Sequence, residues 1–271
     1  MGAEIEAREG CYASLLGDCA GPLSREHAVS EAVLDSINQG EGVVVSGTSW
    51  IEEGSRTLPP SALGSRVLCK RHNEQLGPID EVGVTIFAEI RRAIRDAHAA
   101  CALGVEQTVS GEDFAMWLLK VFCGSIASGQ FRAQSPGEPS PQPSVEPEWV
   151  EVLFGRKRWP SHWSVAIVVD QASHLYTEGG GVEIAPLNIT ATDRIGAFEV
   201  RIEGVRFLLF LSGRPRNLEG QRLVYLPLRM SFRPASTVGY RDIVLVWPKR
   251  AIRETVTFIM SGSSASAPDA V

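Results

Sequence analysis

The sequence predicts an α+β protein in which a compact, turn-rich N-terminal module with appended helices precedes an all-β antiparallel sandwich or barrel. Three observations carry this prediction. Residues 10–80 contain cysteine and histidine at close spacings, and residues 79–129 repeat apolar side chains at helical intervals. Beyond residue 149, short β-branched and aromatic runs alternate with turn residues, which is typical of antiparallel sheets.

Composition indicates a globular chain without a membrane partner. Of the 271 residues, 44% are hydrophobic, which is enough to bury a sizeable core. No window approaches the roughly 20 continuous apolar residues of a membrane span, and the acidic start lacks the regions of a signal peptide. Five cysteines, an odd count at uneven spacing, favour reduced or metal-bound thiols over a disulfide framework. We therefore expect a cytoplasmic protein.

Residues 1–131 are predicted to hold the turn-rich module and two helices. Apolar side chains recur at helical spacing between Ile79 and Leu103, and Gly104 ends the stripe. Ser110 and Asp113 have the spacing of a helix cap, so a second helix is predicted from there to Gly129.

Residues 132–148 are proline-rich and almost free of apolar side chains, so they predict an extended linker. An all-β domain is expected over 149–262, with a hairpin turn at Glu203-Gly204 and a disordered tail at 263–271. Its predicted strands are Val150–Phe154, Val165–Val169, Val182–Pro186, Phe198–Ile202, Val205–Leu211, Leu223–Leu228, Ile243–Trp247 and Thr255–Met260.

Four residues of the N-terminal module have the types and spacing of a structural zinc site. Cys69 and His72 enclose two residues, which is typical of a ligand pair. Cys11 and Cys19 form the second pair, across a longer loop. The alternative is that the cysteines are small buried side chains. Together the four side chains predict one zinc ion.

Glu26, His27 and Asn73 have the side chains that phosphodiester hydrolysis requires. That reaction needs a general base for water and a divalent cation on the phosphate. A neutral histidine supplies the base at pH 7, and carboxylate and amide oxygens bind Mg²⁺ or Mn²⁺. His27 is therefore the candidate base, and Glu26 and Asn73 are candidate ligands of a catalytic ion. The alternatives are a half-buried structural histidine and an asparagine cap.

The series Cys11, Cys19, Glu26-His27 and Cys69-Lys70-Arg71-His72-Asn73 resembles the zinc-containing branch of the HNH endonucleases over residues 10–80. The resemblance implies a ββα-metal fold, DNA as substrate, a 5′-phosphate product and the residue roles given above. The sequence departs from the family pattern at three points. The first cysteine pair is widely spaced, His72 stands where a cysteine is usual, and Leu63-Gly64-Ser65-Arg66 lacks the asparagine that orients the base.

Arg156, Lys157, Arg158 and Trp159 form the densest basic and aromatic cluster and could contact nucleic acid. The alternative is a solvated turn whose tryptophans fold inward.

Two hypotheses of function follow, with a third beside them. The first is an HNH-like DNA endonuclease whose β domain serves recognition or regulation, and Glu26-His27 with Asn73 favours it. The second is a non-catalytic, zinc-scaffolded binding protein whose β domain engages a protein or a small ligand. It is favoured by the net charge of -6 and by the absent orienting asparagine. The third is a component of an assembly in which a basic partner contacts DNA.

Overall fold

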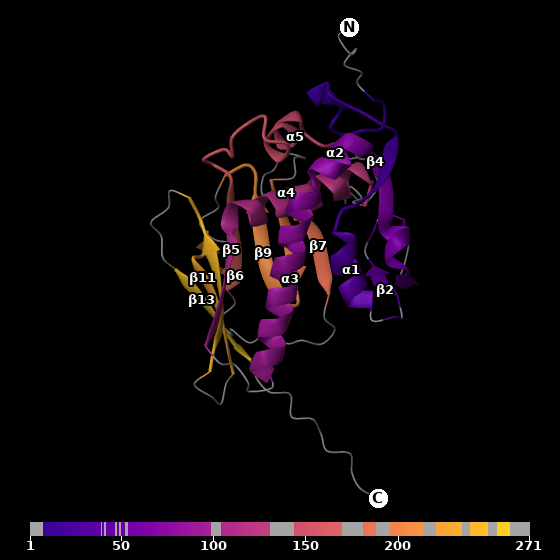
Figure 1. Cartoon of the computed structure of the whole chain (residues 1–271). Helices are drawn as coiled ribbons and strands as arrows, with labels where there is room; N and C mark the ends of the chain where they lie inside the picture. The colour runs from indigo at the N-terminus through magenta and orange to yellow at the C-terminus, as the bar shows by residue number, and fades with distance from the viewer. Residues whose placement is uncertain are drawn as a thin grey trace, which may run out of the picture.

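The computed structural model describes residues 8–38, 40, 42–46, 48, 50–51, 54–98, 104–130, 144–169, 181–187, 196–213, 221–234, 239–248 and 254–260. Over these ranges the chain is a mixed α+β protein with several sheets and no closed barrel (Figure 1). Its helices are α1 (Glu31–Asn38), α2 (Lys70–Gln75), α3 (Gly77–His98), α4 (Gly111–Ala127) and α5 (Pro147–Leu153), with short 3-10 turns η1 (Ser14–Leu16) and η2 (Pro60–Leu63). None of the helices in these ranges has the length and apolar character to cross a membrane.

The N-terminal region is built from two small antiparallel strand pairs. Strand β1 (Leu23–His27) pairs with β4 (Gly64–Cys69), and β2 (Val43–Ser46) pairs with β3 (Ser55–Leu58). Helix α2 begins directly after β4, at Lys70. The β1–β4 pair and α2 therefore follow one another in the order strand, strand, helix, with α1 and the β2–β3 pair inserted between the two strands.

Two larger sheets hold the other strands. The five-stranded sheet is antiparallel, in the order β10 (Arg222–Tyr225), β6 (Ser164–Val169), β9 (Val205–Phe210), β8 (Ala197–Ile202), β7 (Val182–Leu187). The four-stranded sheet has the order β13 (Thr255–Met260), β11 (Arg229–Pro234), β12 (Arg241–Val246), β5 (Val105–Ser110). Strand β13 runs parallel to β11, and β5 runs parallel to β12. This mixed sheet corrects the prediction of an entirely antiparallel β region.

One hydrophobic core extends across the predicted domain boundary. It includes residues from Cys11 to Met260. Helix α4 lies at its centre, where the Phe122 ring lies 4.8 Å from the rings of both Trp149 and Phe198. A helix that is apolar on nearly every side needs cover on every side. The structure thus joins the regions 1–131 and 149–262 that the sequence analysis divided, and β5 adds a strand from the first region to the sheet of the second.

The helix predictions for α3 and α4 are confirmed, whereas the strand predictions contain errors. Helix α3 lies where its apolar stripe indicated, and the Ser110 hydroxyl accepts the Asp113 N–H at 3.2 Å, which caps α4. Val150–Phe154 is not a strand: Pro147 stands in the first turn of α5, a position whose fixed φ suits a helix. Strand β11 was missed because arginine and proline interrupt its apolar pattern. Most of the predicted linker and all of the predicted tail lie outside the described residues.

We expect Phe122→Ala to lower the free energy of unfolding by about 3–5 kcal/mol, the usual cost of removing a buried aromatic ring. Phe122 is fully buried between side chains of both regions, so its loss leaves a cavity in the shared core. Urea unfolding of the wild type and of the variant should each give one transition, with the same midpoint by tryptophan fluorescence and by circular dichroism. Two separate transitions would instead favour independent domains.

Candidate metal centre and candidate catalytic residues

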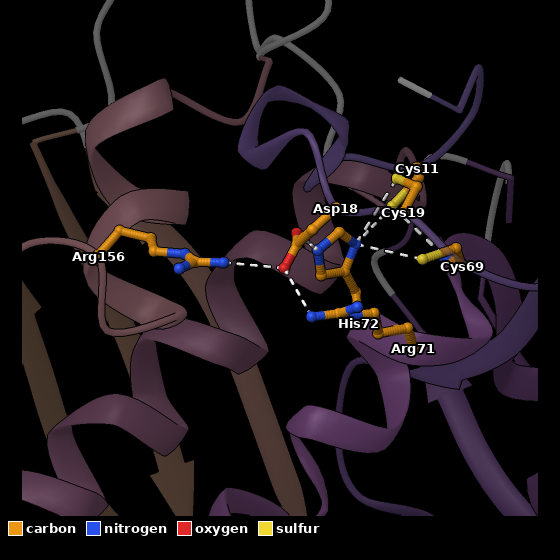
Figure 2. Close-up of polar contacts among 7 residues, drawn as sticks. All are labelled: Cys11, Asp18, Cys19, Cys69, Arg71, His72 and Arg156. Atoms are coloured by element: carbon orange, nitrogen blue, oxygen red, sulfur yellow. Dashed lines mark hydrogen bonds and ion pairs between the residues drawn. The ribbon is translucent and has the colours of Figure 1, made fainter. Parts of the chain in front are cut away.

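Four side chains from separate segments converge near the N-terminus (Figure 2). The Nδ1 atom of His72 lies 3.2 Å from the sulfur of Cys69, 3.5 Å from that of Cys11 and 3.8 Å from that of Cys19. A tetrahedral ion at about 2.3 Å from sulfur and about 2.0–2.1 Å from nitrogen would place these atoms roughly 3.6 Å apart. The observed distances bracket that value, so the predicted ligands could bind a metal such as zinc.

Local structure explains how these ligands reach one another. Cys69 ends β4 and His72 lies on the first turn of α2, so the strand-to-helix junction brings the pair together. The N–H of Tyr12 donates to the Val67 carbonyl, which holds the segment containing Cys11 against β4. The Cys69 N–H also donates to the Cys11 sulfur at 3.3 Å.

Burial and hydrogen bonding affect the thiols of the cluster in different ways. Burial raises the pKa of the Cys11 thiol to about 12. Burial also acts to raise the pKa of Cys69, but hydrogen bonds with the backbone of His72 and Ala20 and with the side chains of Cys19 and Cys11 together lower that pKa. A metal ion stabilises thiolates that would otherwise be costly to bury. The donor set of three sulfurs and one imidazole therefore suits zinc.

Asp18 fixes the orientation of His72 and was missed by the sequence analysis. Its Oδ1 lies 2.8 Å from His72 Nε2, the ring nitrogen that faces away from the sulfurs. Burial acts to raise the pKa of Asp18, but His72, Arg71 and Arg156 together lower it. A carboxylate on the second nitrogen of a metal-binding histidine is common at such sites. The sequence gives only a weak indication of this role, because Asp18 directly precedes the candidate ligand Cys19. Its partner His72 lies 54 positions away in the chain.

Asn73 contacts the strand that carries His27. The Asn73 side-chain amide donates to the Arg25 carbonyl at 3.0 Å, two residues before His27. The His27 ring is 8% exposed, with Nδ1 3.9 Å from a Glu31 carboxylate oxygen. Gly64 pairs with His27 across the strands, and a Cβ there would lie 2.3 Å from Arg25 Cγ. A larger residue at this position would therefore displace the Arg25 side chain.

Glu26 lies in a buried ion pair. Its carboxylate is 4% exposed and 2.6 Å from the Lys120 ammonium. Lys120 lies on α4 and also donates to the carbonyls of His27 and Ala28 and contacts Asp80 at 3.0 Å. Burial raises the pKa of Glu26, and Lys120 opposes that effect. This geometry makes Glu26 the carboxylate partner of a buried ammonium.

The basic and aromatic cluster is largely engaged within the chain. Arg156 lies 2.8 Å from Asp18, and Lys157 lies 2.6 Å from Glu148. Trp159 packs edge-on against the buried Trp163, with ring centroids 5.4 Å apart. Arg158 is exposed. These contacts agree with a turn whose tryptophans fold inward.

Comparison with known proteins gives no relative. No family model, curated protein or solved structure matches this chain. The geometry of the site therefore carries the functional argument.

We expect Lys120→Met to cost about 3–5 kcal/mol of stability, because it leaves the buried Glu26 carboxylate without its cation. The pKa of Glu26 should rise further, so the folded variant would bind more protons than the unfolded chain at pH values above the ordinary 4.5. The deficit should therefore be small near pH 4.5 and grow as pH rises. Urea unfolding at pH 4.5 and pH 8 measures it. Adding Glu26→Gln should recover part of the loss at pH 8, and no recovery would exclude this coupling.

Proposed function

We propose that the chain is a divalent-metal-dependent endonuclease that hydrolyses DNA phosphodiester bonds, on a module held together by structural zinc. One observation carries the proposal: the Asn73 amide donates to the Arg25 carbonyl in the middle of β1, which attaches α2, the helix of the zinc pair, to the strand that ends at His27. This contact groups a candidate base and a candidate oxygen ligand on a strand, strand, helix unit. The HNH resemblance assigns those roles to the same two residues.

In this proposal His27 accepts a proton from the attacking water. Glu31, on the first turn of α1, is the carboxylate closest to the ring, and at 3.9 Å it would stabilise the imidazolium that results. The Asn73 amide donates through Nδ2, which leaves its oxygen to serve as a ligand of Mg²⁺ or Mn²⁺. Glu26 would act on the position of His27 through Lys120. The Lys120 ammonium binds both the Glu26 carboxylate and the carbonyl of His27.

Two adjoining hollows lie on the surface near Glu31, whose carboxylate faces the His27 ring. A hollow of about 430 Å³ is lined by Ser30, Glu31, Asp80 and Glu81. It adjoins a second hollow of about 230 Å³, with which it shares Ala32 and Val84. Three arginines of α3 line the second hollow, at positions 91, 92 and 95. Guanidinium groups are common phosphate ligands. In this proposal the phosphates of a bound strand would contact these arginines and avoid the carboxylates of the first hollow. The arginines would then exchange their contacts with Glu203, Glu89 and Asp96 for the phosphates.

A second candidate is a non-catalytic, zinc-scaffolded binding protein whose β region engages a protein or a small ligand. The buried Glu26–Lys120 pair favours it, since a carboxylate that the resemblance assigns to the catalytic ion is already bound to a cation. The pairing of Arg156 and Lys157 with acidic side chains also reduces the positive charge available for DNA.

Incubation of the zinc-loaded chain with supercoiled plasmid and with single-stranded DNA tests the proposal. We expect nicking that requires added Mg²⁺ or Mn²⁺ and yields 5′-phosphate ends. Omitting the added ion is a better control than a chelator, which would also remove zinc. If neither substrate is cut with either ion, the binding protein is the better account.

A further inference from the structure

The surroundings of His72 are assembled from two distant parts of the chain. Asp18 binds the Nε2 atom of the ring at 2.8 Å, and Phe154 packs edge-on against the same ring with centroids 5.1 Å apart. The other oxygen of Asp18 lies 2.8 Å from Arg156 and 3.2 Å from Arg71. Figure 2 shows Arg156 reaching Asp18 from the side opposite the three sulfurs. Arg156 stands 138 positions after Asp18 in the chain.

We propose that the metal centre couples metal loading to the docking of residues 147–157, with Asp18 as its outer-sphere carboxylate and Arg156 as the positioning residue of Asp18. The turn after α5 therefore completes the site although it supplies no ligand. This role is independent of any nuclease activity.

The chemistry of the imidazole supports this coupling. When Nδ1 binds a metal, Nε2 carries the proton and its N–H donates a hydrogen bond to the carboxylate. The metal withdraws electron density from the ring, which makes that N–H a stronger donor. Asp18 therefore binds His72 more tightly in the loaded state. By linkage, any contact that strengthens metal binding is itself strengthened by the metal to the same factor.

The position of Arg156 is set by the end of α5. The N–H groups of Arg156 and Lys157 both donate to the Glu151 carbonyl, at 2.7 and 3.0 Å. Gly155, at φ 70°, takes the left-handed conformation that commonly ends a helix. The Arg156 side chain is 56% exposed while Asp18 is 18% exposed, so solvent screens the pair in part. Replacing Arg156 should therefore weaken metal binding less than replacing Asp18.

Zinc affinity of full-length variants tests the proposal, by competition with a chromophoric chelator. Asp18→Ala should weaken zinc binding by about 10–100-fold, as expected for an outer-shell partner. Arg156→Ala should weaken it by about 3–10-fold, with Arg156→Lys in between, because lysine keeps the charge and loses the planar fork. Arg158→Ala is the matched control: it removes an exposed arginine of the same turn and should leave affinity unchanged.

Two further readouts separate this role from a general loss of structure. Cobalt-substituted Asp18→Ala should keep the wild-type thiolate absorption bands, since its four ligands are intact. Removing zinc from the wild type should speed amide hydrogen exchange in residues 147–157. In Arg156→Ala, zinc removal should change the exchange rate of the same residues by a smaller factor. Wild-type zinc affinity in both Asp18→Ala and Arg156→Ala, or exchange over 147–157 that ignores zinc, would overturn the proposal.

Discussion

Cys69→Ser is expected to abolish zinc binding and to remove most of the stability of the chain. The wild type should purify with about one zinc ion per chain, because three cysteines and His72 complete a tetrahedral donor set. Binding of structural zinc contributes about 10–16 kcal/mol in small zinc-finger peptides, which is comparable to the roughly 5–15 kcal/mol that stabilises a whole domain. Elemental analysis and thermal unfolding measure the two effects.

The effect of Cys69→Ser should extend beyond the N-terminal module. Cys69 belongs to the same core cluster as the β strands, so unfolding around it exposes side chains that the β region also needs. Cys123→Ser is the matched control, because Cys123 is equally buried and lies outside the ligand group. That variant should keep its zinc. Full zinc content in Cys69→Ser, or a metal-free wild type of unchanged stability, would show that the four residues are not a structural metal site.

His27→Ala is expected to lose about 100-fold or more of metal-dependent DNA cleavage, the scale of a positioned general base. Zinc content and fold should remain, since His27 is not among the four metal-binding residues. Asn73→Ala should lower activity as well, and additional Mg²⁺ or Mn²⁺ should restore part of it, because a lost oxygen ligand weakens ion binding without removing the base. Rates of plasmid nicking at several ion concentrations provide the measurement.

His162→Ala controls for the loss of a histidine elsewhere. His162 is exposed and lies in the turn before β6, so its replacement should leave cleavage unchanged. Equal cleavage by His27→Ala and wild type would exclude His27 as the base.

The residues of the candidate metal centre could be predicted because their signal is largely local. Cys69 and His72 lie one helical turn apart, so their spacing alone indicates a ligand pair. The same holds for α3 and α4, whose apolar periodicity belongs to a single helix. The surroundings of the centre carry no such signal, since Asp18 meets His72 across 54 positions and meets Arg156 across 138.

Local sequence patterns predicted α3 and α4, the four residues that converge as a candidate metal site, and Glu26, His27 and Asn73 as candidate catalytic residues. They did not predict that Lys120, 93 positions from His27, binds Glu26 and the end of β1. Only the tertiary structure decided that β5 joins the distant β12 in a parallel pair and that one core spans both regions. The physical reason is the range of the interactions. Periodicity and ligand spacing act within a few residues, whereas buried ion pairs and strand partners depend on which distant segments pack together.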